Sequence, residues 1–99
     1  MTTDYTDLVK LRADLDAEND IDRKLDVVYD WLSEIHHRED YDLLSSFIGE
    51  VLANPTHPVV TIALVIAANR KHGLKNADQL RELLKRQFIG DPEVVADLV

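Results

Sequence analysis

The sequence of 99 residues contains no cysteine, and this absence excludes several kinds of chemistry. Without a thiol the chain cannot form a disulfide, a thiolate nucleophile, or a cysteine-ligated zinc or iron–sulfur centre. Glycine and proline occur three times each, so there is no low-complexity tract and no linker between two halves. With 45% hydrophobic and 30% charged residues, the composition predicts one globular domain covering residues 1–99.

A long hydrophobic run is also missing. The longest apolar stretch, Pro58 to Ala68, is about half of the roughly 20 residues that a membrane-spanning helix needs. Residues 1–5 are polar and acidic, which is unlike the basic and then apolar pattern of a secretory signal. We therefore expect a cytoplasmic protein with no membrane partner.

Positive charge is scarce and unevenly distributed. The formal net charge is −8, and residues 1–57 carry 14 acidic residues against five lysines and arginines. Between positions 70 and 86 lies a possible basic patch made of Arg70, Lys71, Lys75, Arg81, Lys85 and Arg86. The acidic balance of the whole chain opposes general affinity for phosphate backbones but permits one such local patch. Nucleic acid is therefore not the first partner that we expect.

Apolar residues recur with a period close to 3.6 along nearly the whole chain, which predicts an all-α protein. Helices are expected from residue 4 or 6 to 17, then over 21–37, 41–53, 58–72 and 77–88, with a short sixth helix from residue 92. Because the connections are short, successive helices should pack as antiparallel hairpins. The expected fold has five to six helices, arranged as a compact orthogonal bundle or a short αα-hairpin stack.

Individual residues mark the expected helix ends. Asp40 and Asn76 are candidate N-caps, and Gly73 is a candidate C-cap. Segment 58–72 is rich in β-branched residues, which would suit a strand. We interpret it as a central buried helix, because a single strand would have no partner.

Part of the sequence resembles a known class of proteins. Leu25-Asp-Val-Val-Tyr-Asp-Trp-Leu leads to Asp40-Tyr-Asp-Leu-Leu, then to Thr61-Ile-Ala-Leu and to the stretch from Ala77 to Phe88. This arrangement resembles small uncharacterised helical-hairpin proteins of bacteria and their phages, over roughly the last three quarters of the chain and without a specific motif. The resemblance implies a hairpin architecture and a bacterial or phage origin, and it carries over no catalytic or binding residue.

No pattern in the sequence predicts an active site. The acidic run from Asp14 to Asp22 lacks the glycine and glutamate that an EF-hand loop requires. His36, His37, Glu39 and Asp40 have metal-ligand side chains but fit no zinc pattern, and they equally suit a helix end followed by a helix start. No serine stands in a Gly-x-Ser-x-Gly elbow. We therefore predict no catalytic residue, no metal and no cofactor.

A row of small residues is the most suggestive pattern for binding. On the expected third helix, Ser45, Gly49 and Ala53 recur at every fourth position, with Ser46 beside them. Such a row forms a shallow groove that another helix can approach closely. Because a mid-helix glycine costs about 0.5–1 kcal/mol relative to alanine, we hypothesise that this face receives a second chain or the last helix. The alternative is a plain solvated face.

These observations favour a non-enzymatic protein–protein interaction module. It would be an acidic adaptor or inhibitor that docks on a basic surface of another protein, or a protein that self-associates. The first alternative is a small nucleic-acid-binding protein that uses the basic patch within residues 70–86. The second is an enzyme or metalloprotein whose site is assembled from distant residues. The sequence leaves any small-molecule ligand unidentified.

Overall fold

The computed structural model describes residues 8–71 and 73–98, which form five α-helices and a short 3₁₀ helix. Their bounds are α1 (Leu8–Ala17), α2 (Ile21–Arg38), α3 (Tyr41–Ala53), α4 (Pro58–Arg70), α5 (Ala77–Gln87) and the 3₁₀ helix Pro92–Val94. The described residues contain no strand, so the predicted all-α fold is confirmed. None of the helices in this part of the chain is long and apolar enough to cross a membrane.

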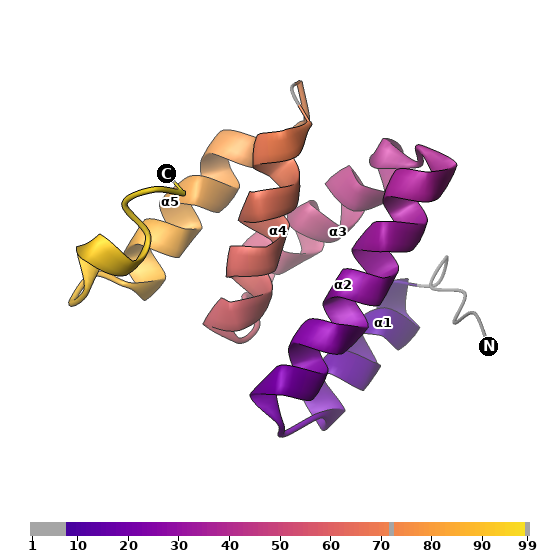
Figure 1. Cartoon of the computed structure of the whole chain (residues 1–99), viewed down its shortest axis with the longest axis horizontal. Helices are drawn as coiled ribbons and strands as arrows, with labels where there is room; N and C mark the ends of the chain where they lie inside the picture. Colours follow the sequence, from indigo (N-terminus) through magenta and orange to yellow (C-terminus); the bar gives the residue numbers. More distant parts are fainter. Residues whose placement is uncertain (1–7, 72, 99) are drawn as a thin grey trace.

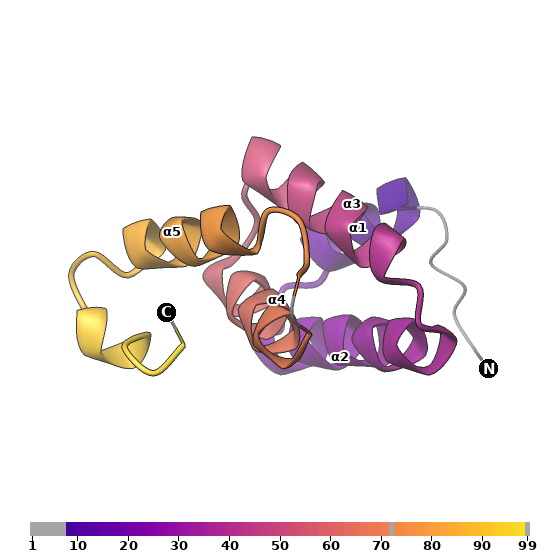
Figure 2. The same ribbon diagram turned by 90° about the horizontal axis from the view of Figure 1, so that it is seen from above.

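The helices pack as a bundle in which α4 has a central place (Figure 1). Helix α4 contacts α2 on one side and α5 on the other, while α3 contacts both α2 and α5. Seen from above, α2 and α4 lie in one layer and α1, α3 and α5 in another (Figure 2). The segment that begins at Pro58 is therefore the central helix, as predicted, although it ends at Arg70 rather than at residue 72. Residue 72 lies outside the described part of the chain.

All five α-helices contribute to one hydrophobic core. Trp31 of α2 and Phe47 of α3 meet edge to face, with ring centroids 5.1 Å apart. The same core contains further fully buried side chains: Leu11, Leu15, Val28, Ile48, Val51, Val60, Leu64, Val65, Leu80 and Leu84. Because burying one such side chain contributes about 1.5–3 kcal/mol, this core fixes the positions of the helices and of the surfaces they carry.

The turn between α2 and α3 is a Schellman motif followed by an N-cap. The N–H of Glu39 donates to the carbonyl of His36 at 3.3 Å, and the N–H of Asp40 donates to that of Ile35 at 3.1 Å. Glu39 has a φ of 57°, in the left-handed region that favours glycine. The carboxylate of Asp40 accepts a hydrogen bond from the N–H of Leu43 at 3.4 Å, so the predicted N-cap is confirmed.

The connection between α4 and α5 differs from the prediction. Lys71, in an extended conformation, is the C-cap of α4, and Gly73 lies two residues further on with a φ of +84°. The prediction that Gly73 caps α4 was therefore wrong. Asn76 precedes α5 as predicted, but it has a φ of 67° and its side chain makes no capping hydrogen bond. The chain uses two left-handed residues, Gly73 and Asn76, to reverse its direction here.

Candidate functional site

Three aspartates form an exposed row on the outer face of α2. Asp22, Asp26 and Asp30 are spaced by four residues, so their side chains lie one above another on the helix surface. Within the described residues, none of these three carboxylates takes part in an ion pair or a side-chain hydrogen bond. Like charges four residues apart in a helix destabilise it by about 0.2–0.5 kcal/mol per pair. These two repulsions oppose the stability of α2, whereas Asp22 in its first turn also interacts favourably with the helix N-terminus.

Two basic residues of the same half of the chain, Arg12 and Lys24, are engaged elsewhere. Arg12 pairs with Asp16 at 3.0 Å and also donates to backbone carbonyls of the α3–α4 connection, 2.6 Å from that of Asn54. Lys24 is buried and its ammonium donates to the carbonyl of Leu15, near the end of α1. Such cations satisfy helix ends and loops. Arg12 and Lys24 therefore hold the fold together, whereas Arg23 is exposed next to Asp22 and three residues before Asp26 and forms no ion pair with the aspartate row among the described residues.

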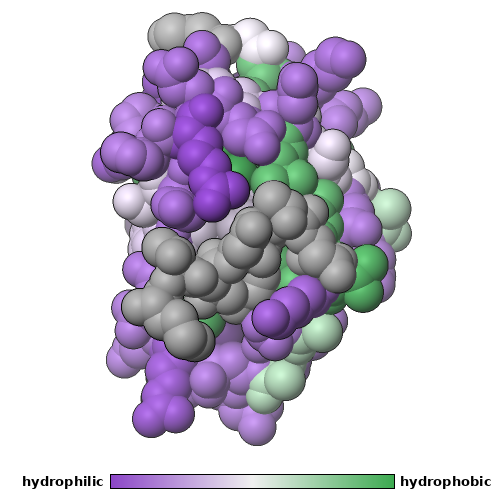
Figure 3. Space-filling view, turned by 90° about the vertical axis from the view of Figure 1, so that its right-hand side faces the viewer, coloured by the Kyte–Doolittle hydropathy of each residue, from purple (hydrophilic) through white to green (hydrophobic). Residues whose placement is uncertain are grey.

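Two large hydrophobic side chains of α2 stand exposed beside the aspartate row. Tyr29 is 44% exposed and Ile21 is 47% exposed. Tyr29 is three residues from Asp26, so the two side chains are neighbours on the helix surface. The side of the molecule shown in Figure 3 is mostly hydrophilic, with hydrophobic atoms gathered between the polar ones. Tyrosine is enriched at protein–protein interfaces, and the rims of these interfaces are polar.

The row of small residues on α3 lies partly against another element of the same chain. Ser46 and Ala53 are exposed, whereas Ser45 and Gly49 are half-buried. A Cβ atom at Gly49 would lie 3.8 Å from the side-chain nitrogen of Asn76, the residue that precedes α5. The middle of the row therefore faces the start of α5. Its use by a second chain stays a prediction.

Several of the predicted basic-patch residues have partners within the chain. Arg81 donates to the side-chain oxygen of Asn69 from two nitrogens, at 3.0 and 2.8 Å, and pairs with Asp78 at 2.9 Å. Lys85 pairs with Glu82 at 3.1 Å. Arg81 therefore links α4 to α5. Because Arg81 and Lys85 are paired with acidic residues of the same helix, α5 offers less positive charge to an external phosphate.

The other basic-patch residues do not converge on one place. Arg70 and Lys71 line a pocket beside α2, and the ammonium of Lys71 lies 4.7 Å from the centre of the Tyr41 ring. Arg86 lines a different depression between α3 and α5, and Lys75 is exposed on the connection between α4 and α5. The six residues thus form no single patch, although Lys71 adjoins Arg70 in the pocket beside α2 and Arg81 in another depression.

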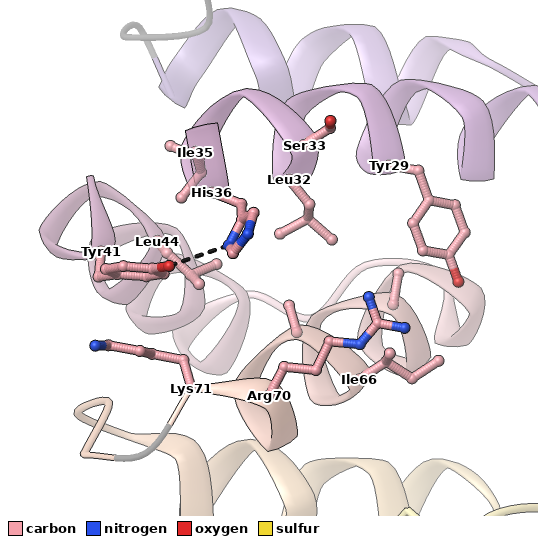
Figure 4. A pocket seen from close by; sticks show the side chains of 12 residues that line it. Tyr29, Leu32, Ser33, Ile35, His36, Tyr41, Leu44, Ile66, Arg70 and Lys71 are labelled. Carbon is pink, nitrogen blue, oxygen red and sulfur yellow. Dashed lines mark hydrogen bonds between the residues drawn. The ribbon is translucent and has the colours of Figure 1, made fainter. Parts of the chain in front are cut away.

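A pocket that no sequence pattern predicted has a volume of about 350 Å³ and lies between α2, α4 and the start of α3 (Figure 4). Its apolar walls come from Leu32, Ile35, Leu44, Ala63, Ile66 and Ala67. Its polar lining consists of Tyr29, Ser33, His36, Tyr41, Arg70 and Lys71. Nδ1 of His36 and the hydroxyl of Tyr41 are hydrogen-bonded at 3.2 Å. We call this feature the α2–α4 pocket.

Histidine and acidic residues do not form a metal-binding cluster in the described part of the chain. No group of three or more such side chains there has an arrangement that could hold a metal ion. His36, which belongs to the cluster of metal-ligand residue types in the sequence, is instead bonded to Tyr41.

The fold and these surfaces define a small all-α bundle with an acidic helix face and one partly apolar pocket. No protein-family model, curated protein or solved structure matches the chain. Its function is therefore inferred from its own surfaces.

Proposed function

We propose that this protein is a non-enzymatic interaction module that docks on a basic surface of another protein through the outer face of α2. The observation that carries the proposal is the unpaired aspartate row, Asp22, Asp26 and Asp30, with the exposed side chain of Tyr29 beside it. A positively charged partner would neutralise all three carboxylates and relieve their mutual repulsion. Such complementarity accelerates association and selects the partner.

Tyr29 supplies the apolar part of this surface. A tyrosine ring covers a large contact area at a low entropic cost, and its hydroxyl can still bind a polar group at the edge of an interface. The surrounding carboxylates orient the partner, whereas burial of the tyrosine ring slows dissociation of the complex. An adaptor or inhibitor that recognises a basic site on its target needs both properties.

The repulsion between the three aspartates is not offset by an ion pair within the described residues, and this also favours a binding role. Functional sites are one place where proteins retain locally destabilising features. The described structure gives the three aspartates no internal partner that would explain their alignment. A complementary partner provides that explanation.

A pull-down with two charge-matched variants tests the proposal. In the first variant, Asp22, Asp26 and Asp30 become Asn; in the control, Glu50→Gln, Glu93→Gln and Asp97→Asn change the net charge equally at other exposed positions. The tagged wild-type protein, the row variant and the control are incubated with a lysate of the native host and washed at low and high salt. Mass spectrometry then identifies what each bait retains.

One protein should be retained by the wild type and the control at low salt and released at high salt, because salt screens exposed charges. Loss of three such charge contacts, at roughly 0.3–1 kcal/mol each, should weaken its binding to the row variant about fivefold to 150-fold. Equal retention by the row variant and the wild type would refute the proposed surface. Retention of the purified protein on DNA or heparin would favour the basic residues between 70 and 86 instead.

A further inference from the structure

We infer that the α2–α4 pocket binds a small amphipathic carboxylate, which is a compact apolar body with one anionic end. This inference concerns a ligand site that adjoins the aspartate row, since Tyr29 belongs to both surfaces, and it does not depend on the proposed protein partner. It stands on the shape of the pocket, on the charge of its lining and on the side chain of Arg70.

The charge of the lining is opposite to that of the chain. The chain has 19 acidic residues and a net charge of −8, but no aspartate or glutamate lines this pocket. Arg70 and Lys71 do line it. A concave site with cationic groups and low-dielectric walls concentrates anions, even on a protein that repels them elsewhere.

Arg70 is the group best placed to bind the anion. It is the last residue of α4, and its side chain extends into the space between α2 and α4 (Figure 4). Within the described residues, the guanidinium has no hydrogen bond and no ion pair, in contrast to Arg81 and Arg12. A guanidinium offers a planar pair of donors that matches the two oxygens of a carboxylate.

The opposite end of the ligand would contact the apolar walls. Ile35, Leu44 and Ala63 are buried, and the half-buried side chains of Leu32 and Ile66 extend the same surface toward the opening. A volume of about 350 Å³ is at the lower end of the range of small-molecule sites, so the apolar body must be compact. Hydroxyl groups of the lining can position the polar end. A fully hydrated anion without an apolar body would make no favourable contact with these apolar walls.

Three probes with the same eight-carbon chain separate the contributions of charge and apolar contact. Octanoate, octan-1-ol and octylammonium are titrated into the isotopically labelled full chain, and inorganic phosphate serves as a purely ionic probe. Backbone amide shifts are followed by two-dimensional NMR, which detects weak binding. Octanoate should cause saturable shifts at the residues that line the pocket, with at least about tenfold weaker binding of octan-1-ol and no saturable binding of octylammonium or phosphate.

Two arginine variants then test whether Arg70 binds the anionic end of the ligand. Arg70→Gln should weaken octanoate binding about tenfold and leave octan-1-ol binding unchanged, because only the charged hydrogen bond is lost. Arg23→Gln removes the same charge from an exposed position near the start of α2 and should leave both affinities unchanged. Ala67→Leu fills part of the pocket and should weaken both ligands.

Several results would overturn the inference. Equal binding of octanoate and octan-1-ol would show an apolar cavity without anion selectivity. Saturable binding of phosphate without octanoate binding would assign a different ligand class. Octanoate binding that is unchanged in Arg70→Gln would show that Arg70 does not bind the carboxylate. Amide shifts spread evenly over the surface would show that octanoate does not bind in the pocket. Because none of these probes is a protein, failure here leaves the proposed docking surface unaffected.

Discussion

Replacing Gly49 by alanine should stabilise the protein by about 1 kcal/mol. Gly49 lies inside α3, where glycine is about 0.8–1.0 kcal/mol less favourable than alanine. The new Cβ atom would meet only the side-chain nitrogen of Asn76 at 3.8 Å, an ordinary van der Waals distance, so no strain offsets this gain. The half-buried position adds a fraction of the roughly 0.8 kcal/mol that burial of one methyl group provides.

Urea and thermal denaturation, followed by far-UV circular dichroism, measure this effect. The midpoint of the urea transition should rise with an unchanged slope, and Tm should rise by about 4–8 °C. Ser46→Ala, at an exposed position of the same helix, is the matched control and should gain only a few tenths of a kcal/mol. A loss of stability in Gly49→Ala would show that α3 is approached more closely than the structure indicates, and would refute the reasoning.

The same variant decides whether the row of small residues is a binding groove. Light scattering after size exclusion measures self-association, and the pull-down measures binding to a partner. If Gly49→Ala is more stable and both kinds of binding are unchanged, the groove hypothesis fails. If association is lost in a correctly folded variant, the close approach of a second helix to this face is supported.

Two further substitutions should also stabilise the fold, by different mechanisms. The hydroxyl of Thr61 is buried without a hydrogen-bond partner among the described residues. Thr61→Val should therefore raise the free energy of unfolding by about 1 kcal/mol. An unchanged or lower value in urea denaturation would show that the hydroxyl is satisfied. Glu39 has a φ of 57°, so Glu39→Gly should raise the free energy of unfolding by about 0.5–1 kcal/mol. Glu39→Ala keeps the strained conformation and should leave the free energy of unfolding unchanged. Equal Tm values for the two variants would contradict this explanation.

The helices could be predicted from the sequence because their signals are local. The 3.6-residue period identifies each helix, and the start of α3 after Asp40 and of α4 at Pro58 follows from capping chemistry within a few residues. The end of α4 could not be predicted in the same way. Lys71 leaves the helix with its ammonium over the ring of Tyr41, a residue that is distant in the sequence, and Gly73 acts in the turn that follows.

The candidate sites show the same division between local and tertiary information. The spacing of Asp22, Asp26 and Asp30 is visible in the sequence, but the absence of an internal partner depends on where Arg12 and Lys24 are bound. The α2–α4 pocket depends on the tertiary packing of α2 and α4, which are separated by α3 in the chain, and of the start of α3. Likewise, only the contact between α4 and α5 shows that Arg81 is engaged by Asn69.

The central claim is that the aspartate row is retained for binding at the expense of stability, and Asp26→Asn tests it most directly. Asp26 is the middle member of the row, so its neutralisation relieves both four-residue repulsions while Asp22 stays at the start of α2. Urea denaturation of this variant is compared with calorimetric binding of the protein identified in the pull-down. Stability should rise by about 0.4–1 kcal/mol while affinity for the partner falls. Lower stability, or higher stability with unchanged affinity, would contradict the claim.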